Sequence, residues 1–332
     1  MELSAFTVLD EYPEDTALGR DRYGEVFDLA RASEDAGLSA VWVAEHHFHS
    51  GGVCPSPPVL LAALGARTRT IRLGAMVSVL PFHDPILVAE EYAMVDRLTG
   101  GRLRLGVGSG YIPMEFQGFG IDPATKRERF DRSYDRLLAA FRGEPVRGES
   151  GSGAGETRLN VRPVQRPHPP IWIAVQRREA LEFVARRGVG VALIPYATVS
   201  GVVELESEIR EYRSHLPPGV VGRVSVALHV YAGDDLAMAR SALQRYLDSR
   251  RATQSTFYEE KVRRDPSQAS AESVERAGFA VFGSPASVVA KLDEFRRAGV
   301  DEVLGLFDFG GLPTASVSAS VTRLGAAWPR AP

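Results

Sequence analysis

Short apolar or β-branched runs alternate with longer amphipathic segments along almost the whole chain. The short runs have the length of strands, and the longer segments repeat their apolar residues at helical spacing. Strands that alternate with helices are typical of βα units around a parallel sheet. Eight strands are predicted, which is the number that closes a (β/α)8 barrel. They span Ala5–Leu9, Ala40–Ala44, Ile71–Val79, Leu103–Val107, Ile171–Val175, Val189–Ile194, Val224–Val230 and Glu302–Leu306.

A helix is predicted for each strand. Pro85 and Pro285 stand where a helix begins, and Gly37, Gly188 and Gly299 stand where one ends. Proline fits the first turn because it lacks the amide hydrogen that is unused there, and glycine adopts the left-handed conformation that often follows the last turn. The predicted helices span Tyr23–Ala36, Pro57–Arg67, Pro85–Leu98, Arg129–Arg142, Glu179–Arg187, Gly201–His215, Asp235–Arg251 and Pro285–Ala298.

Two stretches interrupt this alternation. Gly148–Arg158 is rich in glycine and polar residues, and Thr253–Gly278 is long, charged and without a clear period. We expect both to be insertions at the C-terminal face of the strands, where barrel enzymes build their active sites. The second stretch is a candidate lid. The first could equally well be a disordered loop on the surface. The fold class predicted for residues 1–332 is therefore α/β, a single TIM barrel domain with insertion loops.

Charge and composition narrow the classes of partner. The 39 Lys and Arg residues nearly balance the 42 Asp and Glu residues, for a net charge of −3. Such a chain has no overall positive electrostatic field that would attract nucleic acid or anionic lipid. No apolar stretch approaches the roughly 18 residues that cross a membrane. A small-molecule partner, with no nucleic acid and no membrane, is expected.

Cysteine usage and the first residues predict the compartment. Cys54 is the single cysteine, so the chain cannot form an internal disulfide. The segment Met1–Asp10 has an acidic residue where an export signal has basic ones, and its apolar run is short. A cytoplasmic location is expected.

The first cluster that could carry chemistry follows the second predicted strand. Glu45, His46, His47 and His49 stand where a barrel places its catalytic groups. By strand alternation Glu45 and His47 share one face and His46 takes the other, unless the strand has already turned. A zinc or iron site with Glu45 and Asp84 is an alternative, but no H-E-x-x-H pattern supports it. A histidine that moves protons near neutral pH needs fewer assumptions, so no metal is predicted.

A second cluster, Gly106–Tyr111, follows the fourth strand. Its glycines resemble a dinucleotide-binding turn, but Ile112 and Pro113 follow instead of a helix, which argues against a Rossmann site. A tight loop that lets a ligand approach the barrel mouth and an ordinary turn are equally compatible with it.

A third cluster, Val175–Glu179, lies between the fifth strand and a helix. Free amides at a helix N-terminus, together with Arg177 and Arg178, could hold a phosphate. Two solvated arginines on a surface helix would look the same in the sequence.

Several separated motifs together resemble the bacterial luciferase-like flavin monooxygenases. The resemblance runs from Phe6 to Gly305–Pro313, so it covers nearly the whole chain. The motifs that carry it are Trp42–Phe48, Gly74–Pro81, Asp84–Pro85, Gly100–Gly108 and Glu115–Gly120.

The resemblance implies a (β/α)8 barrel that uses reduced FMN, or reduced F420 in some branches, supplied by a separate flavin reductase. It places the catalytic histidine, an acid and base beside the flavin ring, at His46. It implies a non-prolyl cis peptide against the ring between Met76 and Val77. The other positions that it assigns to the cofactor are Glu45, Gly108, Ser109, Val175, Gln176, Arg177 and Arg178.

Two departures from the family pattern concern the phosphate. Many FMN-dependent members have arginine where this chain has Ser109, and small hydroxylated residues where it has Gln176, Arg177 and Arg178. The positive charge that binds phosphate is therefore expected to have moved from one loop to the other.

The function predicted from the resemblance is a two-component flavin monooxygenase. Dioxygen would add to reduced FMN at C4a, and the C4a-peroxyflavin would oxygenate a small organic substrate. The protein would supply a dry cavity and a proton source, because water and stray protons release hydrogen peroxide. Phe6, Phe48 and Tyr111 are the predicted walls of the substrate pocket.

Three alternatives stay open from the sequence. They are an F420-dependent oxidoreductase on the same barrel, a non-catalytic flavin-binding partner subunit, and a metal-dependent hydrolase. The family expectation is a homodimer, with a heterodimer as its alternative, formed through Pro57–Arg67 and Pro85–Leu98. The substrate is not specified by these residues.

Overall fold

Eight parallel strands close into a ring in the computed structural model, which describes residues 1–17, 19–146, 158–252, 262–263 and 270–329. The ring closes because β9 pairs with both β1 and β7, and β6 pairs with β7. The fold is a (β/α)8 TIM barrel, and all eight predicted strands are present in it. The barrel strands are β1 (Glu2–Thr7), β2 (Ala40–Val43), β3 (Arg72–Val79), β4 (Leu103–Gly108), β5 (Ile171–Val175), β6 (Gly190–Leu193), β7 (Val224–Ala232) and β9 (Glu302–Asp308).

A ninth strand, β8 (Ala280–Gly283), lies outside the ring. It pairs with the second half of β7, from His229 to Ala232, whereas the first half of β7 pairs with β9. The sequence analysis did not predict this strand. It has only four residues and follows a stretch without a clear period, so its apolar pattern is too short to be distinguished from a loop.

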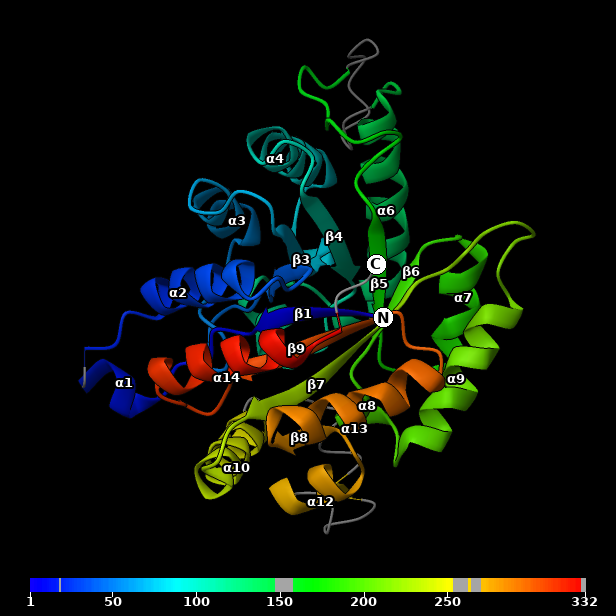
Figure 1. The fold of residues 1–332 in the computed structure, drawn as a ribbon. Coiled ribbons are helices and arrows are strands. Elements are labelled where there is room, and N and C mark those ends of the chain that lie inside the picture. The colour runs from blue at the N-terminus through cyan, green and yellow to red at the C-terminus, as the bar shows by residue number, and fades with distance from the viewer. Residues whose placement is uncertain (18, 147–157, 253–261, 264–269, 330–332) are drawn as a thin grey trace.

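The helices surround the ring of strands (Figure 1). The eight predicted helices are present within a few residues, and α4 has the predicted bounds. The sequence analysis did not predict the short helices α1, α5, α8 and α12, nor α14, which packs on α2. The helices are α1 (Pro13–Ala17), α2 (Arg22–Asp35), α3 (Pro57–Gly65), α4 (Pro85–Leu98), α5 (Pro113–Gly118), α6 (Lys126–Arg142), α7 (Leu181–Arg186), α8 (Pro195–Thr198), α9 (Val202–Ser214), α10 (Leu236–Ala252), α12 (Ala271–Arg276), α13 (Pro285–Arg297) and α14 (Thr314–Ala327).

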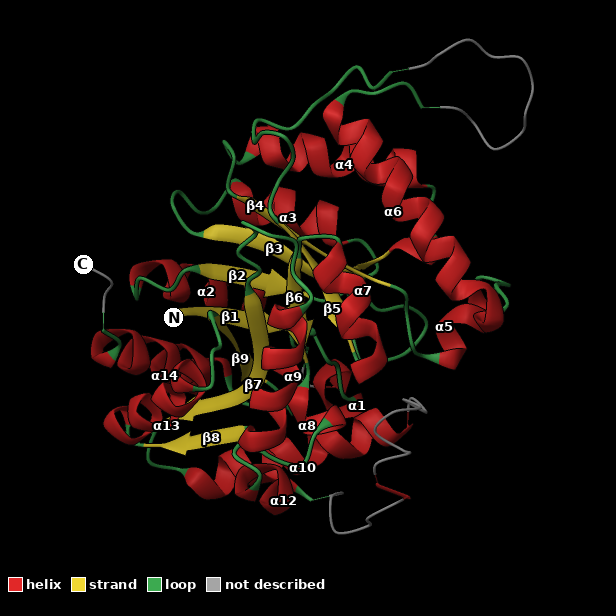
Figure 2. Cartoon of the chain, turned by 90° about the vertical axis from the view of Figure 1, so that its right-hand side faces the viewer, coloured by secondary structure: helices red, strands yellow, loops and turns green. Residues whose placement is uncertain are grey.

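The two predicted insertions are only partly described. Of Gly148–Arg158, residues 148–157 lie outside the described residues, as do 253–261 and 264–269 of Thr253–Gly278. The described end of the second insertion forms α12, which packs on α10 and β8. Figure 2 shows α12 beside these two elements. Within the described chain, no helix is long and apolar enough to cross a membrane.

Side chains fill the barrel interior at the amino ends of the strands. Trp42 of β2 and Trp172 of β5 are buried and meet edge to face, with ring centroids 5.3 Å apart. A Cβ atom on Gly74 would lie 2.2 Å from the Trp42 ring, and one on Gly190 would lie 2.5 Å from the Trp172 ring. These glycines make room for the tryptophans, so the barrel is solid below its mouth.

A buried ion pair completes that lower layer. The Arg104 guanidinium donates to Glu302 Oε1 at 2.9 Å, and Trp42 Nε1 donates to the same oxygen at 3.1 Å. The hydroxyls of Ser4 and Ser225 also donate to the Glu302 carboxylate. A buried charge is tolerated only when it is paired and hydrogen-bonded, and these four donors meet that condition.

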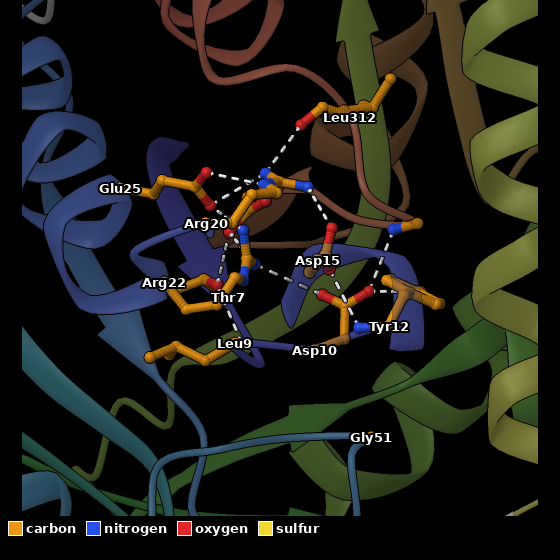
Figure 3. A network of polar contacts seen from close by, with 12 residues as sticks. Thr7, Leu9, Asp10, Tyr12, Asp15, Arg20, Arg22, Glu25, Gly51 and Leu312 are labelled. Atoms are coloured by element: carbon orange, nitrogen blue, oxygen red, sulfur yellow. Dashed lines mark hydrogen bonds and ion pairs between the residues drawn. The ribbon is translucent and has the colours of Figure 1, made fainter. Parts of the chain in front are cut away.

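A second buried ionic network joins the loops after β1 and β9 to the start of α2 (Figure 3). Arg22 donates to Asp308 Oδ2 at 2.8 Å and lies 3.8 Å from Asp10 Oδ1. Thr7 also donates to Asp308, at 3.2 Å. This network holds two loops in place at the carboxyl ends of the strands, beside the cavity described next.

Candidate active site

A cavity of about 300 Å³ opens at the carboxyl ends of the barrel strands. Most of its wall comes from strand ends and the loops that follow them, as in other TIM barrels. Eleven of the residues that the sequence analysis assigned to catalysis, cofactor or substrate line it. They are Phe6, Glu45, His46, Met76, Val77, Gly108, Ser109, Tyr111, Val175, Gln176 and Arg177.

Two assigned residues lie outside the cavity. The Arg178 guanidinium donates to Glu211 Oε2 at 2.5 Å and to the Ser207 hydroxyl, both on α9. Phe48 is 59% exposed, and its ring packs on Phe119 with centroids 5.1 Å apart. The sequence predicted a phosphate contact for Arg178 and a pocket wall for Phe48, and the structure places both elsewhere because the chain turns at these positions.

The end of β2 determines how the Glu-His-His motif is oriented. The strand stops at Val43, so simple alternation does not continue through the motif. Glu45 and His46 both line the cavity, whereas His47 is not among the lining residues and its Nε2 lies 3.1 Å from Glu45 Oε1. Alternation predicted that Glu45 and His46 would face opposite sides, but both line the cavity, because the strand has ended before them.

His46 is held by a carboxylate from a different element. Its Nδ1 lies 3.0 Å from Glu115 Oε1, on the short helix α5. The same oxygen accepts the His47 backbone amide at 3.0 Å and lies 3.2 Å from His49 Nε2. Burial opposes ionisation of Glu115, but the hydrogen bonds from His46 and His49 outweigh it and lower the pKa to about 2. Glu115 is therefore an ionised acceptor.

The proton on His46 can be assigned from this contact. Burial lowers the pKa of His46 below its usual value, although Glu115 acts in the opposite direction. The imidazole is therefore neutral near pH 7. Because its Nδ1 faces an acceptor, Nδ1 carries the hydrogen and Nε2 keeps its lone pair. The neighbouring carboxylate thus prepares the other ring nitrogen to accept a proton.

Glu45 forms a second, similar group. Its Oε1 lies 2.7 Å from His83 Nε2, and its Oε2 accepts the Val79 backbone amide at 3.1 Å. Burial raises the pKa of Glu45, but hydrogen bonds from His47 and His83 outweigh that effect and lower it. The Glu45 carboxylate also raises the pKa of His83 against the effect of burial.

Both groups have the composition of metal sites. In each of the sets Glu45, His47, His83 and His46, His49, Glu115, the candidate ligand atoms lie within 4.8 Å of one another. In both, however, the imidazole nitrogens face an ionised carboxylate, which is the geometry of N–H donors. The hydrogen bonds account for both arrangements. Asp84, the other ligand considered from the sequence, accepts the amides of Ile86 and Leu87 at the start of α4.

The peptide between Met76 and Val77 is cis, as the resemblance implies. The pairing of β3 with β4 shifts register there, between Ala75 and Ser78. A Cβ atom on Gly108 would lie 2.7 Å from the Val77 side chain. Gly108 is therefore required because the neighbouring strand approaches it closely. This reason holds with or without a ligand at the Gly106–Tyr111 loop.

Cations gather where the cavity meets the loops after β4 and β5. Lys126 and Arg127, the first residues of α6, line the cavity with Arg177. Lys126 Nζ lies 3.4 Å from the Gly110 carbonyl oxygen. Burial and the charge of Arg177 both lower the pKa of Lys126, so an anion at this end would be stabilised. The sequence analysis missed Lys126 and Arg127 because they look like surface charges at the start of an amphipathic helix.

The other polar residues that sequence reasoning missed are Tyr196, Tyr246 and Arg250, which line the cavity from α8 and α10. Their positions within helical segments gave no signal. Glu115 is a lining residue as well, and in the sequence it belongs only to the family motif Glu115–Gly120.

The family of the chain follows from one comparison. Residues 1–302 match the family model described as luciferase-like monooxygenase. The chain belongs to the luciferase-like monooxygenase family. The resemblance drawn from the separated motifs is confirmed.

Relatives within this family are flavin-dependent monooxygenases. The oxygenase component of the flavin-dependent trigonelline monooxygenase of Acinetobacter baylyi is 28% identical over 59% of this chain and 54% of its own length. The chain spans about half the length of the curated relatives it matches, from 40% to 64% for the first four.

Solved structures share the whole fold of this luciferase-like chain. The monooxygenase RslO1 from Streptomyces bottropensis has a TM-score of 0.79 at 25% identity and covers 98% of both chains. An F420-dependent secondary alcohol dehydrogenase has a TM-score of 0.74 at 14% identity and covers 99% of this chain and 98% of its own. The oxygenating constituent of 3,6-diketocamphane monooxygenase of Pseudomonas putida, in complex with FMN, has a TM-score of 0.75 at 21% identity and covers 98% of both chains. The same fold therefore occurs with FMN and with F420, and fold alone does not choose between them.

Proposed function

We propose that this luciferase-like chain is the oxygenase component of a two-component monooxygenase, formed by residues 1–332 as one domain. It would take reduced FMN from a separate flavin reductase and use dioxygen to oxygenate a small organic substrate. When bound, the flavin would supply the electrons and the C4a position at which dioxygen reacts. The residues of the chain would bind, orient and exclude water.

One observation carries this proposal. His46 lines an apolar cavity at the carboxyl ends of the strands, and Glu115 holds its Nδ1 at 3.0 Å. A neutral, oriented imidazole in a largely apolar cavity suits controlled proton transfer. Phe6, Met76 and Val175 contribute apolar surface around it. A chain that only stabilised a partner subunit would not need an imidazole oriented in this way.

The residues present fit the phosphate of FMN at one end of the cavity. Ser109 and Gln176 are uncharged donors there, and Lys126 and Arg177 supply positive charge, whereas the Arg127 guanidinium pairs with Asp131 at 3.1 Å. The expected shift of positive charge away from position 109 is consistent with this arrangement. Charge-assisted hydrogen bonds of this kind are the strong contacts in phosphate sites.

The experiment that tests the proposal is an anaerobic titration of the protein with reduced FMN and, separately, with reduced F420. Binding of reduced FMN, followed by a transient absorbance near 380 nm when oxygen is admitted, is expected; this wavelength is roughly where an oxygen adduct of reduced flavin absorbs, since the chemistry belongs to the cofactor. Binding of F420 alone, with turnover under nitrogen, would instead establish the F420-dependent oxidoreductase.

Adjacent arginines offer a matched test of the phosphate end. Arg177→Gln should weaken FMN binding about tenfold, because one charge-assisted hydrogen bond to phosphate is lost. Arg178→Gln should leave it within twofold, because Arg178 binds Glu211 and Ser207 outside the cavity. Fluorescence titration measures both constants, and riboflavin, which lacks the phosphate, should bind the three proteins alike. Equal losses in both variants would contradict this assignment.

We also propose that the chain forms a homodimer through α3 and α4. Val59 of α3 and Leu87, Met94 and Leu98 of α4 are large apolar side chains that are 53% to 71% exposed. The three residues of α4 recur at intervals of seven and four, so they share one face of the helix. An exposed apolar patch of this kind typically marks an interface.

The double variant Leu87→Glu, Leu98→Glu should therefore be monomeric at concentrations where the wild type is dimeric. Two buried carboxylates from each subunit should weaken association by at least about a hundredfold. Sedimentation velocity measures the change. Val203→Glu is the control, since Val203 is 82% exposed on α9. A wild type that sediments as a monomer, or that dimerises only with a different chain, would contradict the homodimer.

A further inference from the structure

A buried guanidinium stands at the cavity end away from the proposed phosphate site. Arg250 lies in the last turn of α10, lines the cavity and is only 3% exposed. It donates to the carbonyl oxygen of Gly51, in the loop after β2. Its Cζ lies 4.8 Å from the centroid of the Tyr246 ring. The guanidinium is thus fixed in position at the wall of the cavity.

Three tyrosines line the cavity around Arg250. Tyr111, Tyr196 and Tyr246 come from three different segments, and the side chains of Tyr196 and Tyr246 hydrogen-bond to each other. Burial raises the pKa of Tyr111 and of Tyr196, so both phenols keep their protons at neutral pH. This end of the cavity therefore offers O–H donors beside the N–H donors of Arg250.

The charge of Arg250 acts on two buried histidines near it. Burial and Arg250 lower the pKa of His229 to about 3, and Arg250 contributes to the lowered pKa of His46 as well. Two carboxylates act on this region, and both accept other donors. Asp10 accepts the Tyr12 hydroxyl and the Gly310 amide, and Glu115 accepts from His46 and His49. Arg250 is thus a buried cation that lines this end of the cavity, and the two nearby carboxylates are hydrogen-bonded to other groups.

The topology separates this end from the other cations. Arg250 follows β7 and its partner Gly51 follows β2, whereas Lys126 and Arg177 follow β4 and β5. In the ring, β7 and β2 flank the pair β9 and β1, and β4 and β5 stand on the opposite side. The wall near β1 and β9 is apolar, with Phe6, Leu304 and Leu306. One phosphate could not occupy both cationic ends of a barrel mouth.

We propose that this end of the cavity binds a substrate that carries one anionic oxygen, as a carboxylate, phenolate or enolate, on an apolar body. The proposal rests on the proposed function, because the opposite end is assigned there to the phosphate of FMN. A guanidinium and phenol hydroxyls are complementary to a single ionised oxygen, and the apolar wall is complementary to a hydrocarbon body. Arg250 would thus determine the charge of the substrates that the cavity accepts.

The first experiment compares two probes of nearly equal shape, benzoate and benzamide, by isothermal titration calorimetry with the wild-type protein. Benzoate should bind roughly 10- to 100-fold more tightly, which is the range for hydrogen bonds to a charged group. Equal affinities would overturn the proposal without any variant, so the test does not depend on the folding of a mutant.

Variants at positions 250 and 251 test whether Arg250 causes the preference for benzoate. Arg250→Gln should abolish the preference for benzoate, and Arg250→Lys should keep part of it. Arg251→Gln is the matched control: Arg251 is half exposed on the same helix and pairs with Asp248. Thermal unfolding by circular dichroism shows whether each variant is folded. A preference that survives Arg250→Gln in a folded protein would overturn the proposal.

The test of the anion site can fail or succeed independently of the test of the proposed function. The probes are titrated first into the protein without flavin, so the charge preference is measured even if FMN does not bind. FMN affinity is then measured in Arg250→Gln and should stay within about twofold of wild type. A large loss of FMN affinity, with benzoate and benzamide unaffected, would assign Arg250 to the cofactor and overturn the substrate role.

Discussion

Replacement of His46 by alanine should lower the yield of oxygenated product about a hundredfold or more, which is the range for loss of a positioned acid or base. The variant should bind reduced FMN nearly as tightly as the wild type, because the cations at the phosphate end are unchanged. The oxygen that no longer reaches substrate should appear as hydrogen peroxide. Stopped-flow mixing with oxygenated buffer, with a peroxide assay, measures both quantities.

His49→Gln is the control for His46→Ala. His49 contacts the same Glu115 oxygen, at 3.2 Å, but does not line the cavity. Its loss should therefore change the coupled yield far less. Full coupled turnover in His46→Ala would show that another group handles the proton, and the proposed role of the imidazole would be abandoned.

The pH dependence follows from the state of the same pair. His46 has a lowered pKa, so the imidazole is neutral at pH 7 and activity should be lost only as the pH falls below the usual histidine range. Glu115 acts to raise the pKa of His46. Glu115→Gln should therefore move the acid limb of the pH profile to lower pH while reducing the maximal rate. A purely structural role for Glu115 would leave the position of that limb unchanged.

The second large effect concerns stability. Arg22→Met should destabilise the fold by about 3–5 kcal/mol, because it leaves a buried carboxylate pair without its cation. Arg22 is 3% exposed and contacts both Asp308 and Asp10. Burial raises the pKa of Asp308 even with Arg22 present. Urea denaturation followed by circular dichroism measures the loss.

Control variants and the pH dependence of stability distinguish the loss of the buried cation from a loss of packing. Arg31→Met, at an exposed position of the same helix, should change stability little. The pair Arg22→Met, Asp308→Asn should recover part of the loss, because the uncompensated charge is gone. With Arg22 removed, Asp308 has a folded pKa above its unfolded value, so the folded state binds more protons. The deficit of Arg22→Met should therefore shrink as the pH falls from about 7.5 to about 5.5, and a constant deficit would mean lost packing.

Much of the fold could be predicted from local pattern. The eight barrel strands are short apolar runs with clear boundaries, and α4 begins at Pro85, as the proline indicates. The ninth strand β8 and the last helix α14 were missed. β8 exists because β7 extends beyond the ring and its second half needs a partner, which is a property of the pairing and not of residues 280–283.

For the residues of the site, what the sequence predicts and what only the tertiary structure decides can be separated more clearly. The position of His46 just after a strand makes it a candidate from the sequence, since parallel strands bring their carboxyl ends to one face. Arg177 and Arg178 are neighbours with the same side chain, and only the turn into the following helix decides that Arg177 lines the cavity while Arg178 reaches α9. Phe48 likewise points to Phe119 because the chain turns there, with a φ of 63°.

Apolar periodicity and motifs of adjacent residues are enough to predict the eight barrel strands, the main helix that accompanies each of them and the family of the chain, because each of these is recorded in neighbouring positions. The surroundings of His46 are not recorded in this way. Glu115, Lys126 and Arg250 come from segments that are far from His46 along the chain. Their side chains meet at the cavity only once the barrel closes, so no spacing in the sequence predicts them.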